Sequence, residues 1–536
     1  MNRRSSGKES AWGRLTLAAL LAAVCLRPTI AAGRQENGMI LIPARQCTVG
    51  TSTAERAELA QRFDCHPTWL GDDLPQHDVN LPPFWIDRCP VTNAQYLAFI
   101  EATDHRRPSW WRQWDGLFPN EYADHPVAGV SGKDATAYAK WAGKRLPTAE
   151  EWEAAAAGQS RSVFAWGDAW PGPLTLPRLH DYIRWELPGT RPVGAGDCGR
   201  SAAGIEDFAG QVLEWVADTL PHHGVQFQLM KAASWFHQDP LSFRIASGWY
   251  AYEDWQASFT GFRCALDGER TPPDVSQSRP PETLLRAVVL RQFDVGGAGG
   301  PPELAAHGGA SRHISISAPN LGSDIIGLTA PETIIWNGSS VMTWRKTPDI
   351  TWLVRTPQRA AYEMRFADLT VEAEFLAHQE SVEQRFTAVN LSGQPGSFIT
   401  SSCFNLQSCP MFYDCEQLRT YVYTAEGKFT PIRRLSRGGD CVRWIAGPSA
   451  EELGKNPRWV LLAVVSRDGR RIIAAGRAAS DSGISVATNT LFTCLHTDST
   501  VHVPPGEKAS TQQFFWFIEG DLGDLLRRAA QDLKPR

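Results

Sequence analysis

The stretch SGKDATAYAKWAGKRLPTAEEWE, residues 131–153, carries the clearest structural signals in the first half of this chain. Ser131 begins one helix-capping pattern and Thr148 begins another, each with an acidic residue three positions further on. Gly143 suits the end of the first helix, and Pro147 prevents that helix from continuing. The stretch therefore predicts two helices, from Ser131 to Gly143 and from Thr148 onward, joined by one sharp turn.

The size and composition of the chain bound its class. Its 536 residues are enough for two or three domains, and a hydrophobic content of 43% is enough for full cores. The net charge of −5 lacks the basic excess that nucleic-acid binding requires, so we expect no nucleic-acid partner. Trp occurs 21 times, and such residues serve the core more often than they form platforms for sugars or peptides.

The N-terminus predicts a secretory signal peptide over residues 1–32. Basic residues precede an apolar run at 15–26 that is too short to span a bilayer, and small residues near Ala31 suit cleavage. We therefore expect a secreted or periplasmic protein with no membrane span after cleavage. Of the 11 cysteines, Cys25 lies inside this segment, and the others permit disulfides in such a compartment.

Beyond the signal, a polar linker divides the chain. Residues 269–283, ERTPPDVSQSRPPET, contain almost nothing to bury. Residues 37–268 are rich in loops with a few helices, whereas residues 284–536 show short alternating strands with regular turn signals. We therefore predict an α+β fold class, with an irregular first domain followed by an all-β sandwich domain.

Further elements are expected from local patterns. In the first domain, Thr92 and Gln95 form a capping pattern for another helix, and strands are expected at 39–43 and 261–266. A short amphipathic helix at 522–533 closes the chain. The strands expected in the second domain include 287–293, 313–317, 333–336, 369–375, 385–390, 419–423, 459–465 and 513–518.

Seven motifs between residues 39 and 267 occur in the order of one known family. They are MILIPARQCTVGTS, FWIDRCPVTNAQYLAFI, DHPVAGVSGKDATAYAKWAGKRLPTAEEWE, FAWGD, GIEDFAGQVLEWVAD, SWFHQDPLSFRIAS and GFRCALD. Together they resemble the formylglycine-generating enzyme, or sulfatase-modifying factor, family. The resemblance implies an irregular α/β domain related to C-type lectin folds.

The resemblance also implies a reaction and a metal. The family's oxidases convert a substrate cysteine of sulfatases to formylglycine with O₂, and two cysteines hold one copper(I). Those cysteines follow the Ser of the penultimate motif, here Ser234, by three and eight residues, where this chain has His237 and Ser242. Because a hydroxyl is a hard ligand that stays protonated, Ser242 cannot replace a copper(I) thiolate. We therefore expect neither copper nor formylglycine-generating activity.

A structural calcium is the other metal that the resemblance implies. In the family, a GNVWEW motif helps to bind calcium through oxygen atoms, and this chain has GQVLEW with Gln211 and Glu214. Gln211 keeps an amide oxygen but is one methylene longer than Asn, which displaces the oxygen by about 1 Å from a ligand position near ~2.4 Å. Both a retained calcium and a loop packed without metal remain open.

Three functions fit these observations. The first is a module that binds a glycan or an extended peptide, and the pocket residues predicted for it are Ser234, Trp235, Asp239, Arg244, Trp249 and Tyr250. The second is an atypical metal-dependent oxidase that uses His237, with Asp239 or a distant residue as co-ligand. The third is a structural protein of the envelope. We favour the first, because a lone histidine is more often a hydrogen-bonded structural residue.

The second domain contains one chemically rich segment, CLHTD at residues 494–498. On a strand, Cys494, His496 and Asp498 share one face, and Asn489 precedes them. A metal would need at least one further ligand, which the sequence does not identify. The segment is therefore either part of a metal site or an ordinary surface strand.

Overall fold

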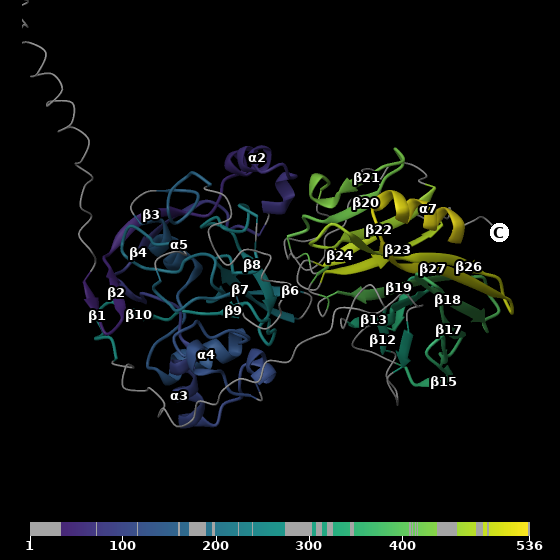
Figure 1. Ribbon diagram of the computed structural model, residues 1–536, viewed down its shortest axis with the longest axis horizontal. Helices are drawn as coiled ribbons and strands as arrows, with labels where there is room; N and C mark the ends of the chain where they lie inside the picture. Colours follow the sequence, from purple (N-terminus) through teal and green to yellow (C-terminus); the bar gives the residue numbers. More distant parts are fainter. Residues whose placement is uncertain are drawn as a thin grey trace, which may run out of the picture.

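The computed structural model describes residues 34–533, apart from 71, 115, 159–160, 171–188, 196–198, 223–224, 238, 274–302, 307–312, 319–324, 343–347, 407–408, 410, 413, 415, 437–457, 479–485 and 490–492. The expected signal peptide, most of the linker and the strand at 287–293 lie outside the described residues. The fold mixes helices and strands, with the helix-containing first half on one side and the strand-rich second half on the other (Figure 1).

Two four-stranded sheets build the first half. One has the order β1 (Gln35–Glu36), β2 (Met39–Ile42), β5 (Phe84–Asp87) and β10 (Ala265–Asp267). The other has the order β8 (Trp249–Tyr252), β7 (Val225–Lys231), β6 (Leu213–His222) and β9 (Thr260–Gly261). A separate pair consists of β3 (Arg45–Val49) and β4 (His77–Leu81). Since β10 pairs with β5, the end of this half returns to its beginning.

The strand expected at 261–266 is wrong as a single element, because it divides into β9 and β10. Between them, the carbonyl of Phe262 accepts from the N–H of Val91, and the carbonyl of Cys264 accepts from the N–H of Asp87. The N–H of Cys264 donates to the Asp87 carboxylate at 2.8 Å. Hydrogen bonds to irregular partners therefore replace the sheet ladder at this point.

The helices of the first half begin at capping residues. They are α2 (Thr53–Arg62), α3 (Asn93–Thr103), α4 (Gly132–Trp141) and α5 (Ala149–Ala157), with short 3₁₀ turns η1 (Pro67–Leu70), η2 (Ser109–Trp114) and η3 (Asn120–Tyr122). Thr92, Ser131 and Thr148 each form a complete capping box, as predicted. Gly143 has a φ of +69°, so the residue predicted to end α4 adopts the left-handed conformation.

Helix α2 was not expected from the sequence. Its N-cap Ser52 accepts from the N–H of Glu55, and the Glu55 carboxylate accepts from the N–H of Ser52. The same kind of capping-box signal that predicted the other helices therefore precedes α2 as well, here with Ser at the N-cap and Glu three residues later.

Two large antiparallel sheets build the second half. The eight-stranded sheet contains β11 (Glu303–Ala306), β12 (His313–Ser317), β13 (Ile325–Trp336), β14 (Ser339–Met342), β19 (Gly396–Asn405), β24 (Val486–Asn489), β25 (Cys494–Thr497) and β26 (Ser499–Val503). The nine-stranded sheet contains β15 (Ile350–Arg355), β16 (Arg359–Arg365), β17 (Leu369–Ala377), β18 (Ser381–Asn390), β20 (Thr420–Tyr423), β21 (Phe429–Pro431), β22 (Trp459–Val465), β23 (Arg471–Ala478) and β27 (Lys508–Glu519). A 3₁₀ turn, η7 (Ile432–Arg434), follows β21.

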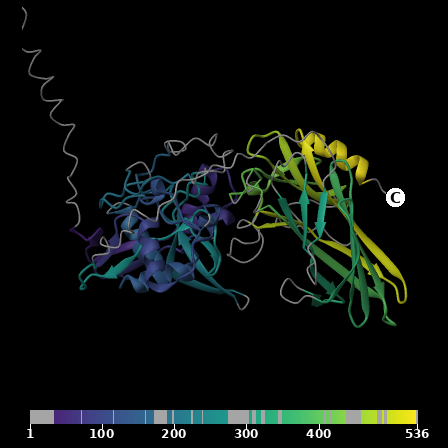
Figure 2. The same ribbon diagram turned by 60° about the horizontal axis from the view of Figure 1, so that its bottom comes forward.

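Side chains of the two large sheets meet in one hydrophobic core. Phe404 of β19 stacks on Phe515 of β27, with their ring centroids 4.4 Å apart. The predicted closing helix is present as α7 (Leu522–Asp532), and Figure 2 shows it lying against the strands of this half. Leu525 and Ala529 of α7 pack with Leu461 and Trp516 in a second core, so α7 covers the other face of the nine-stranded sheet.

The core of the second half continues into the first half. It includes Trp69 and Leu70 of η1 and Leu241. The Trp69 indole donates to the carbonyl of Leu435 at 2.9 Å, and the N–H of His66 donates to the carbonyl of Arg433 at 2.9 Å. The two halves are therefore joined by apolar contacts and by hydrogen bonds.

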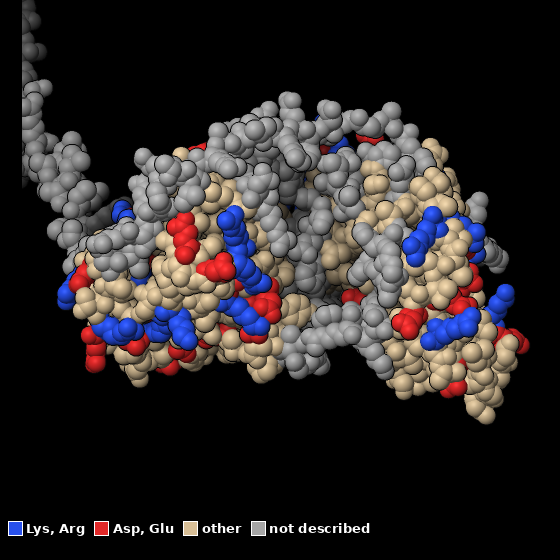
Figure 3. All heavy atoms as spheres, turned by 90° about the horizontal axis from the view of Figure 1, so that it is seen from below, with Lys and Arg blue, Asp and Glu red and all other residues tan. Residues whose placement is uncertain are grey.

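Within the described ranges, no helix has the length and apolar character needed to cross a membrane. Basic and acidic side chains are interspersed on the face drawn in Figure 3. The described cysteines that are free thiols are Cys47, Cys65, Cys89, Cys264, Cys403, Cys409 and Cys494, so none of the expected disulfides joins two of these residues.

Candidate functional site

The segment that occupies the place of the copper-binding motif follows β7 and is buried. Ser234 is fully buried, and His237, Asp239 and Ser242 are exposed by only 3%, 6% and 4%. A backbone bridge joins Ser234 to Gln211 and anchors the start of the segment. Any chemistry at these positions would therefore take place in the interior.

The ring of His237 is fixed by its neighbours. Its Nδ1 accepts a hydrogen bond from the backbone N–H of Ser234 at 3.0 Å and lies 2.7 Å from the Ser234 hydroxyl. The ring also packs edge-on against Trp249 and Phe259, with centroids 4.9 and 6.0 Å away. Because an accepting Nδ1 carries no proton, the proton of the neutral ring lies on Nε2. Neither nitrogen of this tautomer then offers a lone pair to a metal.

Asp239, the predicted co-ligand, is engaged with other groups. One carboxylate oxygen accepts from the N–H of Leu241 at 3.1 Å, and the other forms an ion pair with Arg433 of η7. Its own N–H donates to the Glu416 carboxylate at 3.0 Å. The N–H of Ser242 donates to the Asp239 carbonyl at 3.0 Å. Asp239 therefore shapes a turn and connects the two halves of the chain.

These contacts test the fit of copper(I) to the two positions. A copper(I) ion prefers soft thiolates, whereas Ser242 offers a hydroxyl and His237 offers a ring whose Nδ1 is already an acceptor. The residues present therefore do not fit copper(I).

Arg244, a predicted pocket residue, forms a buried clamp. Its guanidinium donates to both carboxylate oxygens of Asp73, at 2.6 and 3.0 Å, and its Nε donates to the carbonyl of Leu241 at 3.0 Å. Arg244 is exposed by 1%, and the Asp73 side chain is fully buried. A bidentate pair of this kind fixes the geometry of the backbone around it.

The remaining predicted pocket residues lie at or near the core. Trp235 and Trp249 are buried, and Tyr250 on β8 is half-buried. Trp235 contacts Trp110, with centroids 6.5 Å apart. A ligand pocket lined by these side chains stays a prediction.

The predicted calcium ligands bind protein groups. The Gln211 amide accepts from the N–H of Arg191 at 2.9 Å and donates to its carbonyl at 3.2 Å. Both Glu214 oxygens accept from the Arg263 guanidinium, at 2.7 and 2.8 Å, and one of them also accepts from the Trp152 indole. Since a buried guanidinium already neutralises Glu214, these two residues do not fit calcium.

A pocket of about 880 Å³ lies in the first half of the chain. Strand β3, helices α2 and α5, and residues 244–246 contribute to its walls. Its apolar lining includes Ile42, Val49, Leu59, Ala154 and Ile245. Among the six predicted pocket residues, Arg244 lines this pocket and the other five do not. The sequence did not indicate the remaining walls, because they come from segments that are far apart in the chain.

Charged groups surround the pocket in fixed positions. Arg161 donates to the carbonyl of Gly50 at 2.8 Å and to the Glu55 carboxylate at 3.0 Å. Glu153 forms a buried ion pair with Lys231 at 2.7 Å and accepts from the N–H of Gly50 at 2.8 Å. The pocket therefore combines apolar walls with ordered cations and anions, which is typical of ligand sites.

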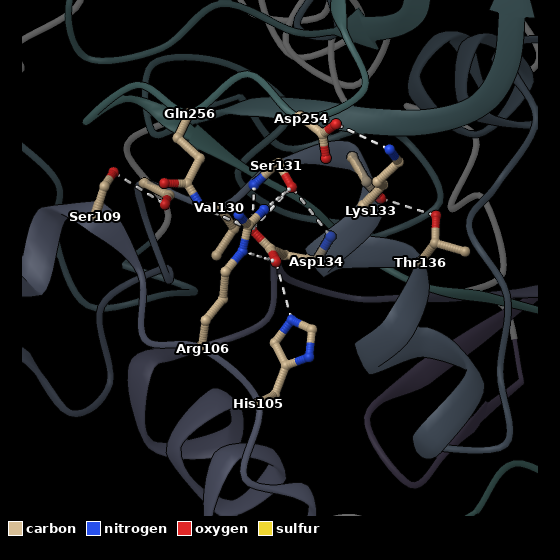
Figure 4. Close-up of polar contacts among 12 residues, drawn as sticks. His105, Arg106, Ser109, Val130, Ser131, Lys133, Asp134, Thr136, Asp254 and Gln256 are labelled. Carbon is tan, nitrogen blue, oxygen red and sulfur yellow. Dashed lines mark hydrogen bonds and ion pairs between the residues drawn. The ribbon is translucent and has the colours of Figure 1, made fainter. Parts of the chain in front are cut away.

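A polar network holds the start of α4 (Figure 4). The Asp134 carboxylate accepts from Arg106 at 2.7 and 2.9 Å, from the N–H of Ser131 at 2.9 Å and from Gln256 at 2.8 Å, and it lies 2.9 Å from His105 Nε2. Burial disfavours ionisation, but these hydrogen bonds lower the pKa of Asp134 to about 2. Asp134 therefore remains ionised at neutral pH and positions the surrounding loops.

The structure brings CLHTD together with a residue that the sequence did not indicate. Cys494 Sγ lies 2.9 Å from His496 Nε2, and Cys403 of β19 joins them, with all three potential ligand atoms within 4.8 Å of one another. The hydrogen bond with Cys494, together with burial, raises the pKa of the Cys403 thiol. Asp498 follows β25 and is half-buried.

With this geometry in view, the relatives can be compared. Residues 28–268 match the Sulfatase-modifying factor enzyme 1-like domain family. The formylglycine-generating enzyme of Thermomonospora curvata is 30% identical over 262 residues, which cover 36% of this chain and 85% of that protein. The chain belongs to the formylglycine-generating enzyme, or sulfatase-modifying factor, family.

Other similarities cover less of the compared protein or are weaker. The hercynine oxygenase of Mycolicibacterium thermoresistibile is 34% identical over 215 residues, and the match covers 34% of this chain and 47% of that protein. A galactose mutarotase related enzyme from Lactobacillus acidophilus is 9% identical, with a TM-score of 0.28 over 41% of this chain and 98% of that chain. A TM-score this low supports no conclusion about fold or function.

Proposed function

We propose that this chain is a family member without formylglycine-generating activity and that its first half binds a ligand. The lack of formylglycine-generating activity is proposed from one observation, the hydrogen bond from the Ser234 N–H to His237 Nδ1. Of the two side chains at the cysteine positions, only His237 could bind a soft metal, and this hydrogen bond occupies it. The pocket of about 880 Å³ beside β3 supports the second part.

An extended peptide is the ligand class that this pocket favours. In the described part of the chain, β4 is the one strand that pairs with β3, and β3 also lines the pocket. We propose that a peptide adds as a further strand along the other edge of β3, where the described residues include no pairing strand. The apolar lining accepts alternate side chains of such a peptide, and the Arg161–Glu55 pair supplies charges at the pocket wall. A glycan would use fewer of these features.

Cys47 of β3 provides a direct test, because it lines the pocket and its half-buried thiol is free. Peptide and oligosaccharide arrays would be probed with the protein before and after alkylation with a bulky maleimide. We expect peptide binding that alkylation abolishes and that persists in alkylated Cys47→Ser protein. Binding of oligosaccharides alone, or peptide binding that alkylation of the wild-type protein leaves unchanged, would contradict the proposal.

An atypical oxidase is the second candidate, because the relatives include hercynine oxygenases. In that case the purified protein consumes O₂ in a metal-dependent way, and His237→Ala abolishes this consumption. The tautomer of His237 argues against this role, because both ring nitrogens are already committed as acceptor and N–H.

We also propose a β-sandwich in the second half and a fold related to C-type lectins in the first half. The Phe404–Phe515 stack supports a β-sandwich in the second half, formed by the two large sheets. The family membership supports a relation of the first half to C-type lectin folds. Export through the N-terminal signal is inferred from the sequence, and secretion assays with the full chain test it.

A further inference from the structure

We propose that Cys403, Cys494 and His496 form a binding site for one thiophilic metal ion, Zn²⁺ or Cu⁺, in the second half of the chain. This site lies outside the segment that replaces the family's copper motif. It is independent of the peptide-binding function proposed above.

Strand pairing brings the three side chains together. Strands β19 and β25 are antiparallel, with Phe404 opposite Leu495 and Asn405 opposite Cys494. This register places Cys403 opposite His496. Phe404 and Leu495 belong to the hydrophobic core, so the residues that alternate with them, Cys403, Cys494 and His496, share the other face of the sheet.

The donor atoms suit a soft metal. Two sulfur atoms and one imidazole nitrogen are the donors that Zn²⁺ and Cu⁺ prefer. Ligand bonds of about 2.3 Å to sulfur and about 2.0 Å to nitrogen place the donors of one ion roughly 3.5–4 Å apart. The observed contacts, from 2.9 Å to within 4.8 Å, bracket this spacing. Small rotations of the side chains are therefore enough to form the site.

A carboxylate orients the imidazole. The Nδ1 of His496 lies 3.5 Å from a Glu332 oxygen and 3.3 Å from the Ser401 hydroxyl, whereas Nε2 lies beside Cys494. Metal-binding histidines usually direct their second nitrogen to such a carboxylate, which fixes the ring and its tautomer. Glu332 lies in β13, where the register with β19 shifts between Thr329 and Thr333. Because of this irregularity, Glu332 lies outside the regular pairing of the two strands.

Burial and charge separate this cluster from a set of surface side chains. Cys403 and Cys494 are exposed by 8% and 2%, and the His496 side chain by 14%. Two deprotonated thiols and a neutral imidazole carry a charge of about −2, which a Zn²⁺ ion neutralises. Three protein ligands leave one position for water on Zn²⁺. A Cu⁺ ion needs no fourth ligand. We therefore expect four-coordinate Zn²⁺ with one water, but three-coordinate Cu⁺, at the same side chains.

Metal titration of the full chain, purified under reducing and metal-free conditions, tests the site. We expect one Zn²⁺ or Cu⁺ per chain, and Co²⁺ in place of Zn²⁺ should give thiolate charge-transfer absorption and tetrahedral ligand-field bands. Stronger binding of Cu⁺ with no Co²⁺ signature would assign the site to Cu⁺. The Cys403→Ser/Cys494→Ser variant should bind neither ion. The control Cys89→Ser removes a half-buried free thiol outside both the cluster and the pocket, and it should bind metal like wild type.

A second variant separates ligation from folding. Glu332→Gln should keep one metal per chain but weaken its affinity about 10- to 100-fold, because it removes the carboxylate and leaves the three donors. Wild-type protein that binds neither ion under reducing conditions would overturn the proposal. A second outcome would also overturn it. Peptide mapping of protein purified without reductant would find a Cys403–Cys494 disulfide, and the same protein would bind no metal after reduction.

Discussion

The ion pair between Asp239 and Arg433 connects the segment that contains His237 and Ser242 to the second half of the chain. Their side chains are exposed by only 6% and 7%. Arg433→Met keeps much of the apolar volume and removes the charge, so it leaves the buried Asp239 carboxylate without its cation. The neighbouring Arg434 forms a pair with Asp64 across the same junction, but those side chains are exposed by 58% and 74%. Arg434→Met is therefore a matched control.

The structure sets the magnitude of the effect. Removing one partner of a buried ion pair costs about 3–5 kcal/mol. Asp239 keeps its hydrogen bond from the N–H of Leu241, so we expect the lower end, about 3 kcal/mol. That loss corresponds to about a 100-fold increase in local opening of residues 239–243, since each 1.4 kcal/mol is about tenfold. For Arg434→Met, an exposed pair predicts about 0–1 kcal/mol.

Hydrogen exchange followed by mass spectrometry measures this opening directly. The Arg433→Met protein should exchange peptides covering 239–243 about 100-fold faster than wild type, and Arg434→Met should change them less than about fivefold. Adding Asp239→Asn to Arg433→Met should restore part of the protection, because the unpaired charge is gone. Equal effects of the two arginine variants, or unchanged exchange in Arg433→Met, would refute the assignment of this pair.

Three further changes have defined outcomes. The pKa of Asp134 is about 2, below its ordinary value of 3.8, so the ionised carboxylate stabilises the fold above pH ~4. This stabilisation is lost as the pH falls through ~2. The difference in melting temperature between wild type and Asp134→Asn should therefore shrink from pH 7 to pH 3. Added Ca²⁺ should leave the melting temperature of the wild-type protein unchanged, whereas Glu214→Gln should lower the free energy of unfolding by about 3 kcal/mol, because the fully buried Arg263 loses its partner. Gly143→Ala should cost about 1 kcal/mol in denaturant titration, because alanine is strained at a φ of +69° although nothing lies within 4 Å of the added methyl group.

Local signals were the most informative part of the sequence. The capping residues Thr92, Ser131 and Thr148 predicted the starts of three helices, because a cap depends only on residues within one turn. The strand at 459–465 was predicted with its observed bounds for a similar reason, since its run of apolar residues is continuous. The same reasoning missed α2, whose polar sequence follows an equally complete capping box at Ser52.

Features that depend on distant residues could not be predicted. The strand pairing that brings Cys403 to His496 is set by the sheet, and nothing near either residue in the sequence specifies it. The use of Asp239 as an anchor depends on Arg433, which comes from the other half of the chain. Residues 387–398 pass from β18 in one large sheet to β19 in the other, and no local signal in the sequence specifies this change of sheet.

With His237 and Ser242 at the two cysteine positions, we expect this family member to lack formylglycine-generating activity. The most direct measurement incubates the protein with copper(I), reductant, O₂ and a cysteine-containing sulfatase peptide, beside the Thermomonospora curvata enzyme as positive control, and determines the peptide product by mass spectrometry. We expect formylglycine only in the control reaction. Formylglycine produced by this protein, and lost in its His237→Ala variant, would contradict it.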